Sequence, residues 1–323
     1  TLARALLGLA ERSLEVILPG YTHLQQGQPI RGAHWALAQL WAILRDRERM
    51  SRVRSAAAVL PLGSGAIAGC PFPIDREALA RELGFDAVSQ TSVDAVADRD
   101  WGAEFLYAGA LAGTHLSRLA EDLILFGSLE FGYLHLPEGF TTGSSLMPQK
   151  RNPDVAELTR GKAGRLVGNL TGFLTLLKGL PTGYNRDLQE DKEQVFDTAD
   201  TLAIVLPAMA GALEGATFRP ERIQPQLDAG LLATDLADLL VAEGVPFRES
   251  HEMVGVLVRR SEELGLPLTE LPTDVLTAVH PALTPTAMAG LTFEGSVERR
   301  AAAGGTSLSS VHAQIAEARR QLS

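Results

Sequence analysis

The chain has 323 residues, of which 46% are hydrophobic and 21% are charged, the proportions of a globular protein with a substantial core. The formal net charge of −10 leaves no general basic surface for a phosphate backbone, so we expect no nucleic-acid partner. We find no apolar run of about 18 residues, which argues against a membrane protein. No basic and apolar leader opens the chain, and the single cysteine, Cys70, cannot form an internal disulfide, so a cytoplasmic location is expected.

Apolar spacing predicts long helices along most of the chain, and almost no alternating run predicts a strand. The opening residues are already helical in pattern and lack an initiator methionine, so we expect the chain to start inside a domain. This first helix is expected to end near Leu18–Gly20. The loop YTHLQQGQP then leads to Pro29, which suits the first turn of a second helix that ends near Val59. A short helix over 75–84 and a long helix over 99–127 follow.

Two more long helices are expected before the pattern changes. Asn152 is the predicted N-cap of one of them, with Pro153 in its first turn and an end near Leu180. Glycines recur along this helix every three or four residues, which predicts close approach of another helix, either in a tight bundle or at a subunit interface. These glycines are Gly161, Gly164, Gly168 and Gly172. The other helix covers about 187–214.

Near residue 217 the long helices give way to short ones broken by proline and glycine. This change predicts an all-α protein with a long helical-bundle domain over 1–222 and a smaller helical domain over 223–323.

The sequence TTGSSLMPQKRNPDVAELTRGK (141–162) joins a loop rich in small residues to a helix N-terminus. Its spacing matches neither a G-x-S-x-G elbow nor an S-x-x-K motif, which argues against a serine hydrolase. The seven histidines show no metal-ligand spacing, so no metal site is expected. Helix amides and Lys150 favour a bound carboxylate, and Ser144 on the same loop is a base only if this electropositive setting deprotonates it.

Several motifs resemble one enzyme family. GSSLMPQKRNP (143–153) resembles the signature loop of the fumarase/aspartase superfamily, whose members cleave a C–N or C–O bond by β-elimination and release fumarate. PGYTHLQQGQP (19–29) and GLPTGYNRDLQEDKE (179–193) are similar to the argininosuccinate lyases of that superfamily, and TSVDAVADRDW (91–101) and GVPFRESHEMVG (244–255) extend the match. The resemblance implies a carbon–nitrogen lyase that splits argininosuccinate into arginine and fumarate in arginine biosynthesis. It also implies a homotetramer with shared active sites and no metal or organic cofactor.

The resemblance assigns roles to the matching residues. Ser144 matches the catalytic base, which removes the proton next to the substrate carboxylate. Lys150 and Asn152 match residues that bind this carboxylate as the aci-carboxylate intermediate forms. His23, with Thr22, matches a pair that assists at the leaving group.

Four more positions match the family. Glu157 matches the carboxylate that orients the histidine, and a pairing with Arg160 one turn further on is the structural alternative. Three positions match residues that hold the amino-acid portion and carboxylates of the substrate: Tyr184, Gln189 and Lys192. The same stretch also resembles a capping box at a helix entry, with Asp187 and Glu190 as its polar residues. Arg99, at the start of a long helix, fits a structural or a catalytic role equally.

Two other functions remain open from the sequence. The signature loop is shared by sister lyases that act on adenylosuccinate, aspartate or malate. An inactive structural relative is the second alternative, because some vertebrate lens crystallins descend from this enzyme. Members of the family also carry an N-terminal domain with further substrate-binding residues, and we expect the chain to lack it.

Overall fold

The chain folds into two compact units, each assembled from separate stretches of sequence. The computed structural model describes all 323 residues. The first unit consists of Thr1–Ala5, Gln39–Leu125 and Leu136–Gly215, and the second consists of Leu6–Ala38, Phe126–His135 and Ala216–Ser323. The domain division expected at residue 222 stays a prediction.

Helices make up most of both units, which confirms the predicted all-α class. The α-helices are α1 (Leu2–Glu11), α2 (Gly32–Ala57), α3 (Arg76–Leu83), α4 (Ser92–Ala95), α5 (Asp100–Gly127), α6 (Asp154–Leu177), α7 (Asp191–Glu214), α8 (Pro220–Ile223), α9 (Ala233–Ala242), α10 (Phe247–Leu264), α11 (Thr273–Val279), α12 (Pro285–Ala289), α13 (Phe293–Arg299) and α14 (Leu308–Leu322). Short 3-10 helices are η1 (Glu138–Phe140), η2 (Arg186–Glu190), η3 (Gln224–Gln226), η4 (Ala229–Leu232) and η5 (Leu268–Glu270).

Four two-stranded ladders join these helices. The antiparallel ladders are β1 (Ile17–Thr22) with β2 (Gln25–Arg31), β5 (Leu134–His135) with β8 (Thr217–Phe218), and β6 (Thr142–Gly143) with β7 (Arg151–Asn152). The parallel ladder is β3 (Val59–Leu60) with β4 (Ala87–Val88). The ladders are short except for β1–β2, so they do not change the fold class.

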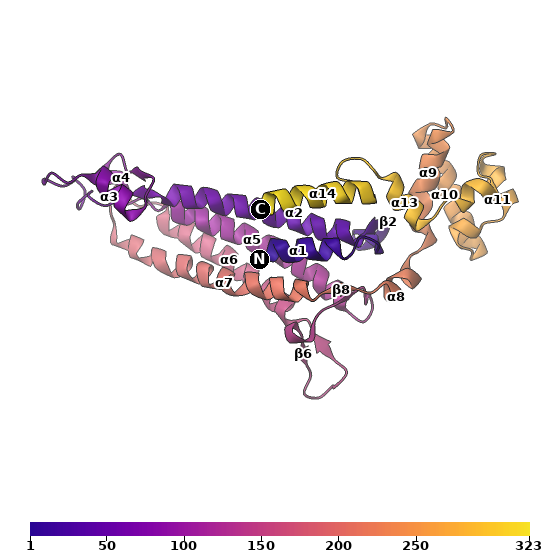
Figure 1. Cartoon of the computed structure of the whole chain (residues 1–323), viewed down its shortest axis with the longest axis horizontal. Helices are drawn as coiled ribbons and strands as arrows, with labels where there is room; N and C mark the ends of the chain where they lie inside the picture. Colours follow the sequence, from indigo (N-terminus) through magenta and orange to yellow (C-terminus); the bar gives the residue numbers. More distant parts are fainter. The chain divides into compact units, whose positions relative to one another are not determined.

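Long stretches of α2, α5, α6 and α7 form the bundle of the first unit and run side by side (Figure 1). α5 lies close to its neighbours where it carries glycine. A Cβ at Gly109 would lie 2.8 Å from the Thr198 methyl carbon of α7, and a Cβ at Gly113 would lie 2.6 Å from a methyl carbon of Leu166 in α6. Ordinary carbon–carbon contacts begin near 3.5 Å, so α5 can approach these helices this closely only with glycine at these positions.

The predicted glycine stripe on α6 is not where helices of one chain meet closely. A Cβ at Gly161, Gly164 or Gly168 would meet no atom within 4 Å, and at Gly172 it would meet only the Gln194 side chain. Exposed apolar side chains lie on the same helix, namely Leu158, Val167 and Leu174. The first alternative, a tight bundle within the chain, is therefore wrong for these glycines.

The β1–β2 hairpin of the second unit corrects two sequence predictions. The first helix ends at Glu11 rather than near Leu18, and Pro29 lies in β2 rather than in a helix. Pro19 and Pro29 face each other across the ladder. Each strand of a two-stranded ribbon has one free edge, where a residue without an N–H is tolerated. Proline, which usually signals a break in a strand, therefore misled the prediction.

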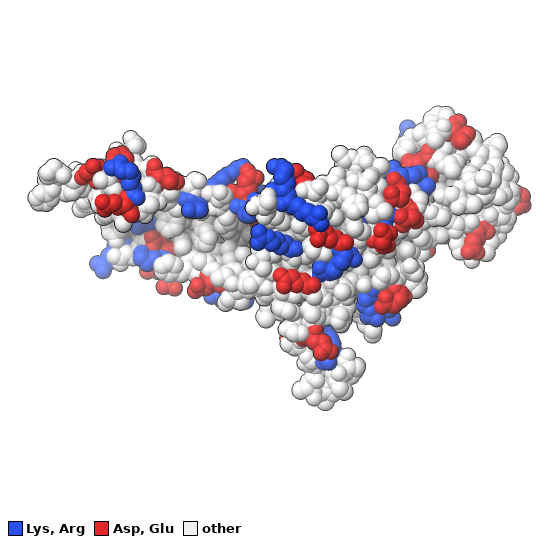
Figure 2. All heavy atoms as spheres, in the orientation of Figure 1, with Lys and Arg blue, Asp and Glu red and all other residues white.

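The C-terminal helices of the second unit enclose a hydrophobic core of their own. Its fully buried members include Leu236 and Leu240 from α9, Leu257 from α10 and Leu283 from the loop before α12. Acidic and basic side chains are interspersed over the molecular surface in the view of Figure 2.

One helical stretch, Arg186–Glu214, is long and apolar enough to cross a membrane by length and composition alone. The sequence reading had found no such segment. Core helices of soluble proteins meet the same criteria, and this stretch contains α7, which packs along α6. Packing in the bundle explains part of its apolar character, because 39% of the apolar window is buried within the chain.

Candidate active site

The predicted catalytic loop lies at the tip of a short hairpin in the first unit. Thr142 pairs with Asn152 and Gly143 with Arg151, so residues 144–150 form the connection between β6 and β7. This hairpin leads directly into α6, which begins at Asp154 with Pro153 as its N-cap. The predicted cap at Asn152 was one residue early, because Asn152 is held in the ladder.

Ser144 is partly buried, and its hydroxyl faces the backbone of its own loop. The Oγ atom accepts hydrogen bonds from the amides of Leu146, at 3.2 Å, and Met147, at 3.0 Å. Two N–H groups directed at one oxygen favour negative charge on it, which lowers the cost of forming an alkoxide. The geometry therefore suits a serine that acts as a base.

Lys150 is the last residue of the connecting loop, and Asn152 lies in β7 of the same hairpin. Lys150 is exposed, and its amide donates to the carbonyl of Met147 at 3.0 Å. Asn152 donates to the Thr142 hydroxyl at 3.4 Å, and that hydroxyl donates to Asp154 at 2.6 Å. The lysine charge and the free amides at the start of α6 thus belong to one short segment, as an anion site requires.

Glu157 lies in the first turn of α6 and is exposed. Arg160 pairs instead with Glu121 of α5, at 2.7 Å. The pairing of Glu157 with Arg160, considered from the sequence, is therefore not formed as a hydrogen-bonded ion pair, and the Glu157 carboxylate has no such partner within the chain.

Tyr184, Gln189 and Lys192 lie near the start of α7, and all three are exposed. Residues 186–190 form η2, whose N-cap Asn185 makes no capping hydrogen bond with its side chain. Glu190, the N-cap of α7, makes none either. The capping-box interpretation of this stretch is therefore wrong, and its polar side chains are available for other contacts.

Asp191 connects this stretch to Arg99, the residue before α5, and was missed by the sequence analysis. Its carboxylate accepts from Lys192 Nζ at 2.8 Å and from Arg99 Nε at 2.5 Å. Burial by itself would raise the Asp191 pKa, but the hydrogen bonds from Lys192 and Arg99 outweigh it and hold the pKa below its ordinary value. An acidic residue beside a predicted ligand was the available signal, whereas its arginine partner lies 92 residues away in the chain.

Thr22 and His23 lie in the second unit, at the turn of the β1–β2 hairpin. Thr22 pairs with Gln25, so His23 and Leu24 alone make the turn, with φ angles of 56° and 57°. A left-handed conformation at a residue other than glycine costs about 1–3 kcal/mol, and such residues cluster at functional sites. The turn therefore holds the exposed His23 in a conformation that the local sequence disfavours.

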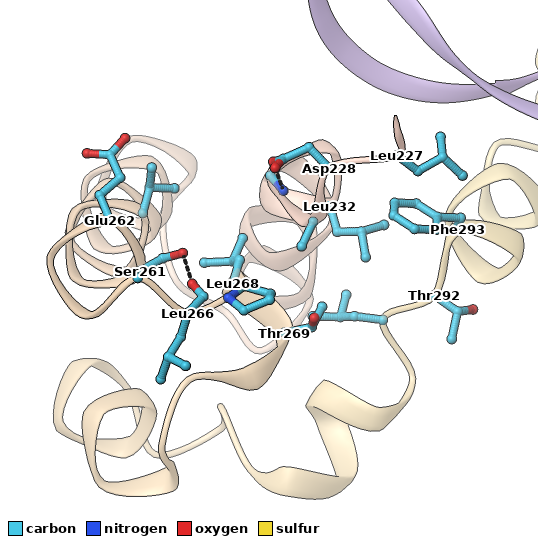
Figure 3. Close-up of a pocket in the computed structure, with 16 residues that line it drawn as sticks. Leu227, Asp228, Leu232, Ser261, Glu262, Leu266, Leu268, Thr269, Thr292 and Phe293 are labelled. Atoms are coloured by element: carbon cyan, nitrogen blue, oxygen red, sulfur yellow. Dashed lines mark hydrogen bonds between the residues drawn. The ribbon is translucent and has the colours of Figure 1, made fainter. Parts of the chain in front are cut away.

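A separate cavity of about 810 Å³ lies among the C-terminal helices (Figure 3). Its lining is mostly apolar and includes Leu232, Leu268 and Phe293, with Asp228 at one side. None of the predicted site residues lines it.

Two family models match separate parts of the chain. Residues 1–168 match a family described as lyase, and residues 230–298 match a family described as argininosuccinate lyase C-terminal. An argininosuccinate lyase from Roseiflexus sp. (strain RS-1) is 56% identical over 319 residues, which are 99% of this chain and 70% of the relative. The argininosuccinate lyase of Herpetosiphon aurantiacus is 51% identical, with 98% of this chain and 70% of the relative covered.

Solved structures show the same fold. An EDDS lyase variant with bound fumarate superimposes with a TM-score of 0.90 at 28% identity, covering 99% of this chain and 66% of that chain. A class II fumarase from Schistosoma mansoni has a TM-score of 0.76 at 17% identity over 90% of this chain and 63% of that one. The second likeness concerns the fold alone.

The chain spans about 70% of the length of the curated relatives. The match covers 99% of this chain in the Roseiflexus relative and 98% in the Herpetosiphon relative. The chain belongs to the argininosuccinate lyase family of carbon–nitrogen lyases.

Proposed function

We propose that the protein cleaves argininosuccinate by β-elimination to give arginine and fumarate, as a step of arginine biosynthesis in the cytoplasm. The observation that carries the mechanism is the pair of amide hydrogen bonds to Ser144 Oγ. Family membership supports the reaction, and the solved relative with bound fumarate supports fumarate as a product. No metal or organic cofactor takes part in the proposed reaction.

In the proposed mechanism Ser144, as the alkoxide, takes the proton from the carbon next to one substrate carboxylate. The electrons of that C–H bond pass into the carboxylate, which becomes the doubly charged aci-carboxylate. Lys150 and Asn152 bind this group, and they accelerate the step to the extent that they bind it more tightly than the ground state. The C–N bond then breaks, its electron pair leaves with the guanidine, and fumarate forms.

The other site residues act on the leaving side and on substrate binding. His23, with Thr22, assists at the departing guanidine nitrogen, which must gain a proton, and Glu157 orients the histidine. Tyr184, Gln189 and Lys192 hold the amino-acid part and the remaining carboxylates. Lys192 is already held in place by Asp191, which supports this role.

The proposed assembly is a homotetramer whose active sites combine residues of several subunits. Its support is the exposed surface of α6 and α7, which pack together: α6 carries glycines with no atom near them and exposed leucine and valine, and α7 exposes Phe196 and Ile204. Such a face favours close packing against helices of other copies. Gly164→Leu would block this packing, and its Cβ would meet no atom within 4 Å inside the chain. Light scattering should then show smaller species, and an unchanged tetramer would count against this face as the interface.

The test of the mechanism uses Ser144→Ala, with Ser145→Ala as the matched control on the same loop. Ultraviolet absorbance of fumarate measures turnover with argininosuccinate. Loss of a general base should reduce kcat of the Ser144 variant by about 10²–10⁴-fold, and the Ser145 variant should remain close to the parent. Equal turnover by parent and Ser144→Ala would exclude Ser144 as the base. Substrate binding without any release of fumarate by the parent would favour an inactive structural relative.

A sister lyase is the second candidate, because the EDDS lyase structure matches with a TM-score of 0.90. A panel of succinate-bearing substrates separates the candidates, with arginine, adenylate, ammonia or a diamine as the reporter product. Release of arginine with the highest kcat/KM supports the first proposal. Preference for another amine would transfer the assignment to a sister reaction while leaving the role of Ser144 in place.

A further inference from the structure

The turn that carries His23 rests on one cross-strand pair. Tyr21 in β1 faces Gln26 in β2, directly below the Thr22–Gln25 pair that closes the turn. The register shifts between Gly20 and Tyr21, so the ladder is irregular immediately below this pair. The two-residue connection of a twisted antiparallel ladder favours positive φ at both central residues, so the ladder accounts for part of the left-handed conformation of His23 and Leu24.

Tyr21 is fastened to the body of the second unit through its hydroxyl. Its Oη lies 2.8 Å from the Oη of Tyr133, which is completely buried. The Tyr21 ring also packs against Phe131, with 5.7 Å between ring centroids. Burial, followed by the hydrogen bond with Tyr21, raises the pKa of Tyr133 above its ordinary value, so Tyr133 keeps its proton at neutral pH.

Gln26 is fastened on the opposite strand through both ends of its amide. Its Nε2 donates to the carbonyl of Gln226 at 2.9 Å, and its Oε1 accepts from the amide of Asp228 at 3.4 Å. Gln226 in turn donates to the carbonyl of Phe131 at 2.8 Å. The anchors of the two strands are thus connected to each other, since Phe131 and Tyr133 belong to the same segment.

We propose that Tyr21 and Gln26 are positioning residues that hold the His23–Leu24 turn in its left-handed conformation and thereby fix the imidazole of His23 for catalysis. The catalytic part of this inference rests on the function proposed above for His23. Strained backbone persists where surrounding contacts determine it, and the side-chain anchors next to the turn add such contacts to those of the ladder. Loss of either anchor lets the turn relax while the rest of the hairpin keeps its ladder.

The kinetic test introduces Tyr21→Phe, Tyr133→Phe and Gln26→Ala separately into the assembled enzyme. Gln25→Ala, one residue away with no side-chain hydrogen bond, is the control for Gln26, and the exposed Tyr107→Phe is the control for the tyrosines. Each anchor variant should lower kcat on the order of 10-fold with little change in KM, below the ~10²-fold that a 1 Å misplacement can cost. Wild-type kcat in all three, or equal losses in the controls, overturns the proposal.

The double variant Tyr21→Phe/Tyr133→Phe separates a role in fold stability from a role in positioning His23. It removes both hydroxyls, so no buried hydroxyl is left without a partner. Its thermal midpoint should recover relative to the single variants, while its kcat should stay reduced. Recovery of kcat together with stability would mean that the hydrogen bond only stabilises the fold, which overturns the positioning role.

Nuclear magnetic resonance of His23, which does not depend on catalytic activity, distinguishes this proposal from the proposed function. The imidazole resonances of His23, assigned by comparison with His23→Asn, should broaden or split in the anchor variants because the turn samples more than one conformation. Unchanged resonances contradict the positioning role. Full turnover by His23→Asn would instead refute the catalytic role of His23, and the resonances would still decide whether the anchors hold the turn.

Discussion

The ammonium group of Lys192 lies 2.8 Å from the carboxylate of Asp191, its neighbour at the start of α7. Arg99, the residue before α5, occupies the other carboxylate oxygen, so one buried anion links a proposed substrate-binding lysine to the segment that leads into α5. The side chain of Asp191 is only 11% exposed, whereas that of Lys192 is 59% exposed. Lys192 is therefore anchored by Asp191 while more than half of its side chain remains exposed to solvent.

Asp191→Asn should make the free energy of unfolding less dependent on pH in the acid range. The pKa of Asp191 in the folded state is held below its ordinary value of 3.8. The resulting stabilisation is fully present above the unfolded pKa and is lost as the pH falls through the folded pKa. Urea unfolding at several acid pH values should show this loss in the parent and less of it in Asp191→Asn. The exposed Asp200→Asn on the same helix is the control, and the same change in both variants would contradict the prediction.

Asp235→Ala should destabilise the second unit strongly. The Asp235 carboxylate is completely buried and accepts from Ser296 at 2.6 Å, Arg299 at 2.8 Å and Arg300 at 2.9 Å. Removing it leaves two arginines without their shared anion, which should cost about 3 kcal/mol of unfolding free energy. Asp238→Ala, on the exposed face of the same helix, should cost less than about 0.5 kcal/mol. Equal urea midpoints for the two variants would show that the cluster does not stabilise the fold.

Gly109→Ala should destabilise the bundle of the first unit. The added methyl group would lie 2.8 Å from Thr198, a fully buried side chain with a stiff branched Cβ. Overpacking of this kind costs about 1–3 kcal/mol, more than the helix propensity gained by alanine. Gly255→Ala in α10 is the control because its methyl group would meet only the end of the Arg259 side chain, at 3.8 Å. Equal unfolding free energies, measured at one protein concentration, would contradict the close approach of α5 and α7.

Leu24→Gly should stabilise the hairpin by relieving backbone strain at residue 24. Leu24 is 67% exposed and has a φ of 57°, so the substitution removes backbone strain at little loss of burial. The gain should be about 1 kcal/mol in unfolding free energy, since left-handed conformations cost L residues roughly 1–2 kcal/mol. Leu24→Ala keeps the Cβ and should show no such gain. A gain of the same size with alanine would mean that strain at residue 24 is not the cause.

Residues close in sequence carried most of what was predicted correctly. The helix over 99–127 was predicted from apolar spacing, and the helix over 75–84 from its closing glycine. The structure confirms both within one residue and shows that Gly84 has a positive φ. The loop with Ser144 and Lys150 was predicted as a site from its resemblance to the signature loop of the fumarase/aspartase superfamily, whereas its hairpin was not predicted. The roles of the site residues stay predictions, although the amides at Ser144 agree with one of them.

The sequence by itself determined the helical class, the family and the segments that hold the candidate catalytic groups, because periodicity and motif spacing are properties of neighbouring residues. Only the tertiary structure decided that Pro19 pairs with Pro29, that Asp191 joins Arg99 to Lys192, and that Tyr21 and Gln26 brace the turn at His23. These relationships depend on which faces of distant segments meet. That choice is set by the packing of the whole unit, which no local pattern encodes.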